Sequence, residues 1–228
     1  MTLSEVLNNL NLIARPEHLA KLAHFGIKDS KALGIKMPDL RKLAKKIGKN
    51  HELALELWAT EIHEARILAS MIEGPKTITE SQIDSWVTDF DSYICDVTCD
   101  LLGQTPLVFN KIEEYSRREE EFVKRSAFAM MCKLAFHDKE MTSEQYFPFF
   151  DLIEREAWDD RNFVRKAVNW ALRQIGKRNE ALRLKAIETA ERILVQGAKS
   201  ARWIATDALR ELQDEKVISR VRNNTLKN

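Results

Sequence analysis

Aromatic and cationic side chains alternate along one stretch of the chain, residues 162–177. The members of this stripe, three or four residues apart, are Phe163, Lys166, Trp170, Arg173 and Lys177. Because a helix turns once every 3.6 residues, side chains at this spacing share one face. Such a face fits an anionic partner that has flat apolar parts, and nucleic acid is the first candidate. The alternative is that Trp170 packs against a second helix while the cations lie in solvent.

Carboxylates recur at a similar spacing in residues 91–102, where Tyr93, Asp96 and Asp100 share a helical face. A carboxylate opposite a basic surface has two interpretations. It can pair with a cation such as Arg125, which residue chemistry alone favours. It can also stabilise positive charge that develops in a reaction, as on the sugar during cleavage of a glycosidic bond.

The other chemistry-bearing residues form no recognisable site. The five histidines lack the spacing of metal ligands, and the three cysteines fit packing in a reduced protein better than zinc or disulfide bonding. His63 and Glu64 beside Arg66 predict a buried polar cluster between helices. Neither a phosphate-binding loop nor a nucleophile motif occurs. We therefore expect neither a metal nor a cofactor.

The composition is that of an ordinary soluble protein. Of 228 residues, 44% are hydrophobic and 31% charged, and only seven are Gly and five Pro. Few breakers of regular structure favour a mostly helical chain. No apolar run approaches the roughly 20 residues that span a bilayer, and the first residues lack the pattern of a signal peptide. We expect a cytoplasmic protein, most simply a monomer without membrane contact.

The net charge of +1 is unevenly distributed. Residues 1–120 carry 15 cationic and 19 anionic side chains, whereas residues 121–228 carry 21 and 16. Within residues 161–202 the counts are 11 and 3. The aromatic and cationic stripe thus lies in the most basic part of the chain, which favours attraction of a polyanion.

Apolar periodicity predicts helices separated by short breaks over the whole chain. We expect them at about 3–13, 17–25, 37–47, 50–59, 61–73, 79–89, 91–102, 105–118, 119–136, 142–157, 161–177, 179–197 and 199–213, with a last one from about 215. In the helix at 161–177, a second stripe should face a core; its members are Val164, Val168, Ala171 and Ile175.

An internal repeat relates these helices. Residues 122–127 (FVKRSA) match residues 163–168 (FVRKAV) 41 positions later, and residues 171–175 (ALRQI) match 208–212 (ALREL) 37 positions later. A helical period near 40 predicts an all-α, HEAT-like solenoid of stacked antiparallel helix pairs, one domain over residues 1–228. Aligned by these offsets, several basic and aromatic residues should line one concave groove: Arg125, Lys166, Trp170, Arg173, Trp203 and Arg210.

Four segments carry a resemblance to a known family: 37–45 (MPDLRKLAK), 56–58 (ELW), 63–69 (HEARILA) and 162–173. In their order, and over nearly the whole chain, the sequence resembles the bacterial DNA alkylation repair proteins of the AlkD type, which are HEAT-like DNA glycosylases. The resemblance implies that double-stranded DNA lies in the groove. It also implies hydrolysis of the N-glycosidic bond of cationic N3- or N7-alkylpurines, without flipping of the base into a pocket.

Carried over by motif, the implied catalytic residue is Asp96. The residues implied at the substrate are Tyr93, Arg125, Phe163 and Trp170, and those expected at the DNA backbone are Lys166, Arg173, Trp203 and Arg210. The chain departs from the family twice: Ser92 stands where a tryptophan is expected, with Tyr93 displaced by one position, and Asn162 replaces a phenylalanine. Two other functions therefore remain open. One is a non-catalytic HEAT-like protein for damaged or branched DNA, and the other is a protein-interaction scaffold.

Overall fold

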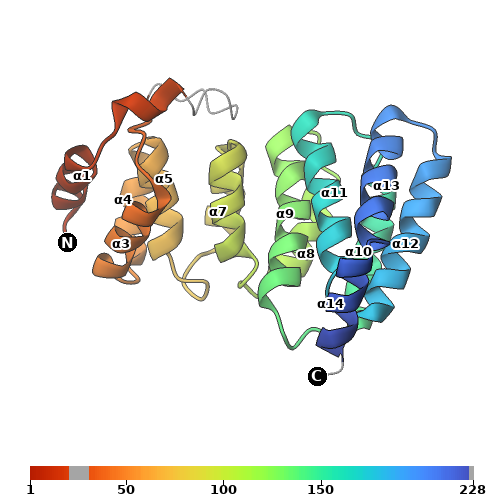
Figure 1. The fold of residues 1–228 in the computed structure, drawn as a ribbon. Coiled ribbons are helices and arrows are strands. Elements are labelled where there is room, and N and C mark those ends of the chain that lie inside the picture. The colour runs from red at the N-terminus through yellow and green to blue at the C-terminus, as the bar shows by residue number, and fades with distance from the viewer. Residues whose placement is uncertain (21–30, 226–228) are drawn as a thin grey trace. The chain divides into compact units, whose positions relative to one another are not determined.

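A computed structural model describes residues 1–20 and 31–225, and every regular element in these ranges is helical (Figure 1). The all-α prediction is confirmed. The chain forms two compact units, Met1–Leu107 and Val108–Asn228. The assignment of one domain to residues 1–228 stays a prediction.

The predicted helices agree with the described ones to within three residues at each end. The first unit contains α1 (Leu3–Leu12), the 3₁₀ helix η1 (Pro16–His18), α3 (Met37–Ile47), α4 (His51–Ala59), α5 (His63–Ile72), α6 (Glu80–Thr88) and α7 (Ser92–Leu102). The second unit contains α8 (Val108–Ser116), α9 (Glu121–His137), α10 (Ser143–Glu156), α11 (Asn162–Gly176), α12 (Glu180–Val195), α13 (Lys199–Leu212) and α14 (Glu215–Thr225). For the helix expected at 17–25, residues 21–25 lie outside the described residues.

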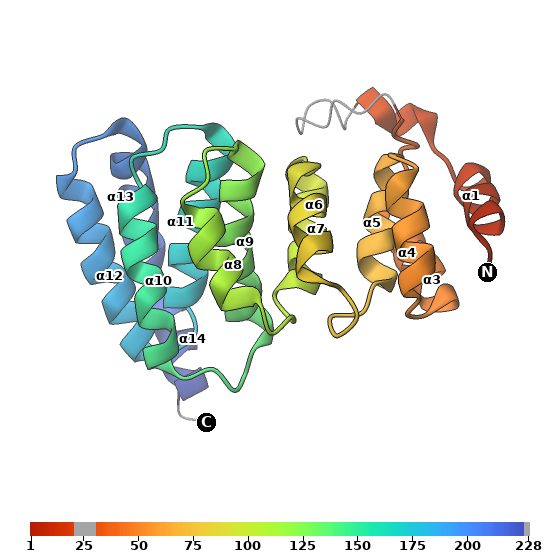
Figure 2. The same ribbon diagram turned by 180° about the vertical axis from the view of Figure 1, so that it is seen from behind.

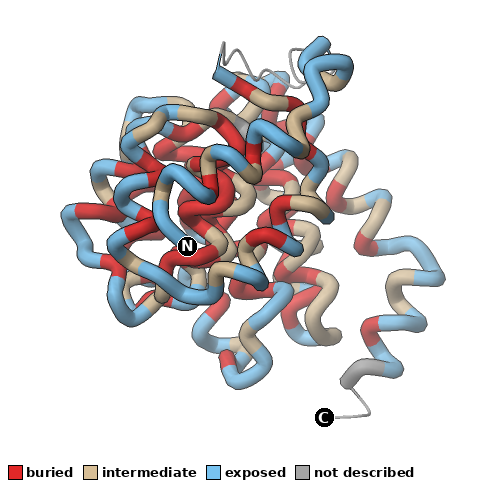
Figure 3. Tube along the Cα trace, turned by 90° about the vertical axis from the view of Figure 1, so that its left-hand side faces the viewer, coloured by how far each residue is buried: buried red, intermediate tan, exposed pale blue. Residues whose placement is uncertain are grey.

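The second unit has two layers of helices. In one layer α11 packs between α9 and α13, and in the other α10 packs against α8 and α12 (Figures 1 and 2). Each helix of the first layer also packs on its neighbour in the chain, α8, α10 or α12. Buried and exposed positions accordingly alternate along the helices (Figure 3). Successive antiparallel pairs of this kind are the arrangement that the internal repeat predicted.

Helix α11 has the two faces that its sequence predicted. Its four core residues, Val164, Val168, Ala171 and Ile175, have no solvent exposure. Its last residue is Gly176, where a β-carbon would come within 2.8 Å of the Ala186 side chain and 2.9 Å of the Leu212 side chain. The absence of a side chain therefore lets α11 approach α12 and α13 closely, which fixes its outer face relative to α13.

In the first unit, α3, α4 and α7 all pack on α5. Trp58 of α4 and Trp86 of α6 stack with ring centroids 4.0 Å apart and planes only 2° from parallel. Both indoles are nearly fully buried. Apolar burial of this kind is the main stabilising contribution to such helix pairs, because an isolated helix of this length is marginal in water.

Candidate nucleic-acid interface

Helix α11 presents its aromatic and cationic stripe away from the core. Phe163 and Trp170 are half-buried, whereas Lys166 is exposed. Lys166 makes no hydrogen bond or ion pair with any described residue. A cation held on a rigid helix without a protein partner is available to an anionic ligand.

Along the line where α9 meets α11, a cation lies against an aromatic ring. The Arg125 side chain is buried, and its Nη1 donates a hydrogen bond of 3.1 Å to the carbonyl oxygen of Phe163. Its guanidinium carbon lies 5.7 Å from the centroid of the Phe163 ring, and the Phe122 ring lies 5.1 Å from the same centroid. Arg125 thus fixes the first turn of α11 to α9 and orients Phe163.

Trp170, about two turns after Phe163 in α11, also has a cation of α9 near its ring. The Nζ of Lys133 is 5.6 Å from its ring centroid, and the Phe136 ring is 6.3 Å away. With the amide oxygen of Gln174 turned toward the indole, Nε1 donates to it at 3.3 Å. Lys133 and Phe136 were not predicted as site residues. The 41-residue offset between α9 and α11 places Lys133 level with Gln174, one turn beyond Trp170, so the repeat did not indicate this contact. A cation and a second aromatic group therefore both lie near the ring.

The line where α11 meets α13 begins with a cation stacked on an exposed indole. The guanidinium carbon of Arg165 lies 5.1 Å from the ring centroid of Trp203, which is 39% exposed. Three further cations lie on the same two helices near this end; they are Lys166, Lys199 and Arg202. None of these four cations forms an ion pair with a described residue. Their charges are therefore uncompensated.

The other end of the same line is compensated by carboxylates that sequence reasoning missed. Nη1 of Arg173 lies 2.5 Å from Oε2 of Glu211 and 3.5 Å from Oδ2 of Asp207. Nζ of Lys177 lies 2.6 Å from Oε1 of Glu211, and Arg210 pairs with Asp207. Glu211 lies 38 residues after Arg173, near the repeat offset, so the repeat itself could have revealed the pairing.

The pKa of Glu211 follows from this environment. Partial burial raises this pKa. The hydrogen bond from Lys177 and the charges of Lys177 and Arg173 lower it by more, so the net shift is downward. Glu211 is consequently ionised at neutral pH and neutralises part of the charge of both cations. Of the four residues predicted at the DNA backbone, Arg173 and Arg210 are therefore ion-paired, whereas Lys166 carries an uncompensated charge and Trp203 supports Arg165.

In the first unit, α7 presents the predicted carboxylate face. Tyr93 is 37% exposed, and Asp96 and Asp100 are less buried than the core positions of the helix. Burial raises the pKa of Tyr93, the charge of Arg41 lowers it, and the charge of Asp96 raises it, with a net upward shift. Tyr93 and Asp96 thus lie close enough to interact electrostatically.

The start of α7 is fixed by a polar pair, buried His63 and half-buried Asp91. The Asp91 side chain accepts hydrogen bonds from the backbone N–H groups of Tyr93 and Ile94, at 2.9 and 2.8 Å, and its Oδ2 lies 3.0 Å from Nδ1 of His63. Burial raises the pKa of Asp91, but the interaction with His63 and the two backbone N–H groups lower it more. His63 and Glu64 are both buried, as expected. They have separate partners, however, because Glu64 accepts from the backbone N–H groups of Leu33 and Ile35, and Arg66 pairs with Asp89.

The predicted site residues are divided between the two units. Tyr93 and Asp96 belong to the first unit, and all the others belong to the second. The structure brings together Arg125 with Phe163, and Arg173 with Arg210 through Asp207. In the part of the chain that is described, no cluster of three or more His, Cys, Asp or Glu residues could hold a metal ion. Nor does any helix of these residues combine the length and apolar character needed to cross a membrane.

Comparison with known proteins adds three findings. The sequence pattern of the DNA alkylation repair enzyme family matches residues 6–212. A Listeria innocua protein, described as uncharacterized protein Lin0241, is 30% identical over 93 residues; the match covers 40% of this chain and 42% of that protein, so the chain spans less than half the length of this relative.

A solved structure is described as "a new family of proteins related to the HEAT-like repeat DNA glycosylases with affinity for branched DNA structures". It superposes with a TM-score of 0.77 at 21% identity, over 84% of this chain and 83% of that one. At this identity the likeness shows the fold alone, and the HEAT-like prediction is confirmed.

Proposed function

The chain belongs to the DNA alkylation repair enzyme family, and from this premise we propose that it binds double-stranded DNA and hydrolyses the N-glycosidic bond of cationic N3- or N7-alkylpurines. The observation that carries the proposal is the outer face of α11. There Phe163 and Trp170 lie half-buried against cations, beside the uncompensated charge of Lys166. Cations attract the phosphates, and aromatic rings provide contact with bases or sugars.

The proposed chemistry needs neither a strong acid nor a cofactor. An N3- or N7-alkylated purine already carries positive charge, so it can leave without protonation. As the bond breaks, charge moves from the base to the sugar. A carboxylate beside the sugar interacts more strongly with that transition state than with the ground state, and only such a difference accelerates the step. We assign this role to Asp96, which also orients the attacking water.

Tyr93 and Trp170 are proposed to hold the damaged nucleotide. A cationic base over an aromatic ring is stabilised by the ring's negative face. Tyr93 offers part of its ring to solvent beside Asp96, and Trp170 already has the Lys133 ammonium near its ring. Ser92 and Asn162 remove two aromatic groups expected in the family, so the stabilisation of the base rests on fewer rings.

A second candidate function is binding of branched DNA without catalysis. It is favoured by the description of the solved structure of similar fold, whose proteins have affinity for branched DNA, and by the loss of two aromatic groups. The same face of α11 would serve this function, since phosphate contacts do not depend on the base. A scaffold for protein partners is less consistent with the uncompensated cations of α11 and α13.

Release of the base from DNA that contains N7-methylguanine distinguishes these functions. We expect Asp96→Asn to reduce the rate on the order of 100-fold or more, the typical effect of losing one preorganised electrostatic group. DNA affinity should stay equal or rise slightly, because a negative charge is removed. Asp100→Asn, one helical turn away on the same face, is the matched control and should keep most of the activity. A wild-type protein that releases no cationic base but binds a four-way junction more tightly than duplex would establish the second candidate instead.

A further inference from the structure

The turn between α10 and α11 exposes an indole that the proposed DNA site does not use. Trp158 is 58% exposed. It borders a surface hollow of about 720 Å³, which is also lined by Lys124, Arg117 and Arg161. A tryptophan so exposed forgoes most of the stabilisation that its burial would give, and tryptophans in well-packed hollows are frequent anchors of protein interfaces.

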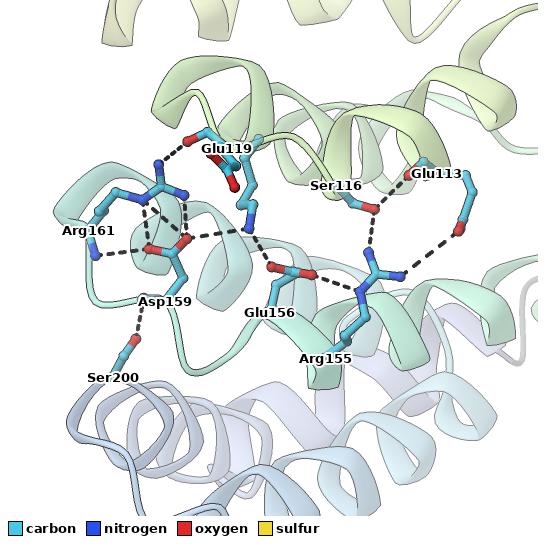
Figure 4. Close-up of polar contacts among 9 residues, drawn as sticks. Glu113, Ser116, Glu119, Arg155, Glu156, Asp159, Arg161 and Ser200 are labelled. Carbon is cyan, nitrogen blue, oxygen red and sulfur yellow. Dashed lines mark hydrogen bonds and ion pairs between the residues drawn. The ribbon is translucent and has the colours of Figure 1, made fainter.

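A network of charged side chains, partly buried, joins the turn that carries Trp158 to its neighbours (Figure 4). The Asp159 side chain is buried and accepts from Nη2 of Arg161 at 2.6 Å, and its carbonyl accepts from Oγ of Ser200 at 2.8 Å. Nζ of Lys124 lies 2.6 Å from Oε2 of Glu156 and 3.6 Å from Oδ2 of Asp159. Burial raises the pKa of Asp159, but Arg161 lowers it more, so the carboxylate stays ionised.

One cation of this network lies near the indole, and the network leaves negative charge around it. The Lys124 ammonium lies 5.6 Å from the Trp158 ring centroid. Lys124, Arg117 and Arg161 are each paired with a carboxylate. By contrast, Glu119 and Asp160 line the hollow, are exposed, and form no side-chain hydrogen bond or ion pair with a described residue. The uncompensated charge of the hollow is therefore negative, the opposite of the charge at the start of α11 and α13.

We propose that this hollow binds a lysine or arginine side chain from a basic segment of a protein partner. The cation would lie against the exposed part of the Trp158 ring, where cation–π attraction and the charges of Glu119 and Asp160 act together. Both carboxylates disfavour nucleic acid at this position, because phosphates would be repelled. The hydrogen bonds and ion pairs of the turn lower the entropic cost of binding, since the backbone that carries the indole is already held in place.

A tri-arginine peptide with blocked ends tests this proposal, in calorimetric titration of the full chain at low salt. We expect saturable binding that weakens about tenfold or more in Trp158→Ala, and similarly in the Glu119→Gln/Asp160→Asn double variant. Trp158→Phe should stay within about threefold of wild type, because it keeps an aromatic face. Since Trp158 is exposed, its replacement should leave the thermal unfolding temperature nearly unchanged.

Two matched variants separate a local site from general attraction. Trp203→Ala removes the other exposed tryptophan of the second unit, and Glu191→Gln removes an exposed, unpaired carboxylate of α12; neither should alter peptide binding. Equal weakening by Glu191→Gln, or unchanged binding in Trp158→Ala, would overturn the proposal. Loss of DNA affinity rather than peptide affinity in Trp158→Ala would do so too, and would assign the hollow to nucleic acid.

Discussion

The two ends of the line between α11 and α13 use the same residue types for different purposes. At the start, Arg165 stacks on Trp203, and no described carboxylate pairs with Arg165 or Lys166. At the other end, Glu211 joins Arg173 and Lys177 across the two helices. The first arrangement leaves positive charge for a ligand. In the second, the cations form ion pairs that join the two helices. Position relative to a carboxylate, more than the number of cations, decides where a polyanion can bind.

The local charge count shows why this difference is hard to see in the sequence. Residues 161–202 hold 11 cationic and 3 anionic side chains, yet the compensating carboxylates, Asp207 and Glu211, come just after that window. When these two carboxylates are counted, the net charge near Arg173 and Lys177 becomes less positive, whereas the net charge near Arg165 and Lys166 is unchanged. The basic surface is consequently narrower than the count implies and centred on the first turns of α11 and α13.

The largest expected effect on DNA affinity follows from removing the uncompensated charges. The Arg165→Ala/Lys166→Ala variant should lose on the order of tenfold in DNA affinity, to a similar extent for most DNA sequences. The slope of log affinity against log salt concentration should become shallower, by an amount equivalent to about two fewer released counterions. Fluorescence anisotropy with labelled duplex over a series of salt concentrations measures both quantities. Arg173→Ala/Lys177→Ala removes two cations from the paired end and should cost clearly less. Equal losses in the two double variants would remove the distinction between the ends.

A smaller effect, of opposite sign, should follow from releasing the paired cations. Glu211→Gln keeps the shape of the side chain but removes the charge that compensates Arg173 and Lys177. We expect DNA affinity to rise about threefold and the salt dependence to steepen by about one ion. Glu191→Gln makes the same change in net charge on α12 and is the control for long-range attraction. An unchanged affinity in Glu211→Gln would mean that DNA does not reach this end of α11.

The smallest effect concerns stability. Because the pKa of Glu211 is lowered in the folded protein from about 4.5, its ion pairs stabilise the fold above that pH, and this contribution is lost as the pH falls through the folded-state pKa. Glu211→Gln should lower the free energy of unfolding by about 0.5 kcal/mol at pH 7, since the pair is partly exposed. Urea unfolding at pH 7 and pH 3 measures it, and the difference from wild type should shrink at pH 3. Lys166→Ala should change neither value measurably.

Much of the fold was predictable because helical periodicity is a local property. The spacing of apolar residues such as Val164 and Ile175 predicts the buried face of α11 from one segment alone. The repeat of residues 122–127 at 163–168 predicts that α9 and α11 occupy equivalent positions in successive helix pairs. The partners across the helices were less accessible. The 37-residue offset puts Trp203 level with Lys166, but the cation over its ring is Arg165, because position 165 faces α13. The repeat predicts how far along its helix a residue lies. It does not predict which neighbouring helix the side chain faces.

The stacked pair of Trp58 and Trp86 gives the first unit an optical signature of its own. Two indoles stacked at 4.0 Å are close enough for their electronic transitions to couple, and where the two transition dipoles are rotated relative to each other the coupling gives a paired positive and negative band in far-ultraviolet circular dichroism. Trp158, Trp170 and Trp203 lie in the second unit and lack such a partner among the described tryptophans. Unfolding of the first unit can therefore be followed by loss of this coupled band. Emission from the more exposed indoles reports on the second unit in the same sample, without any added label.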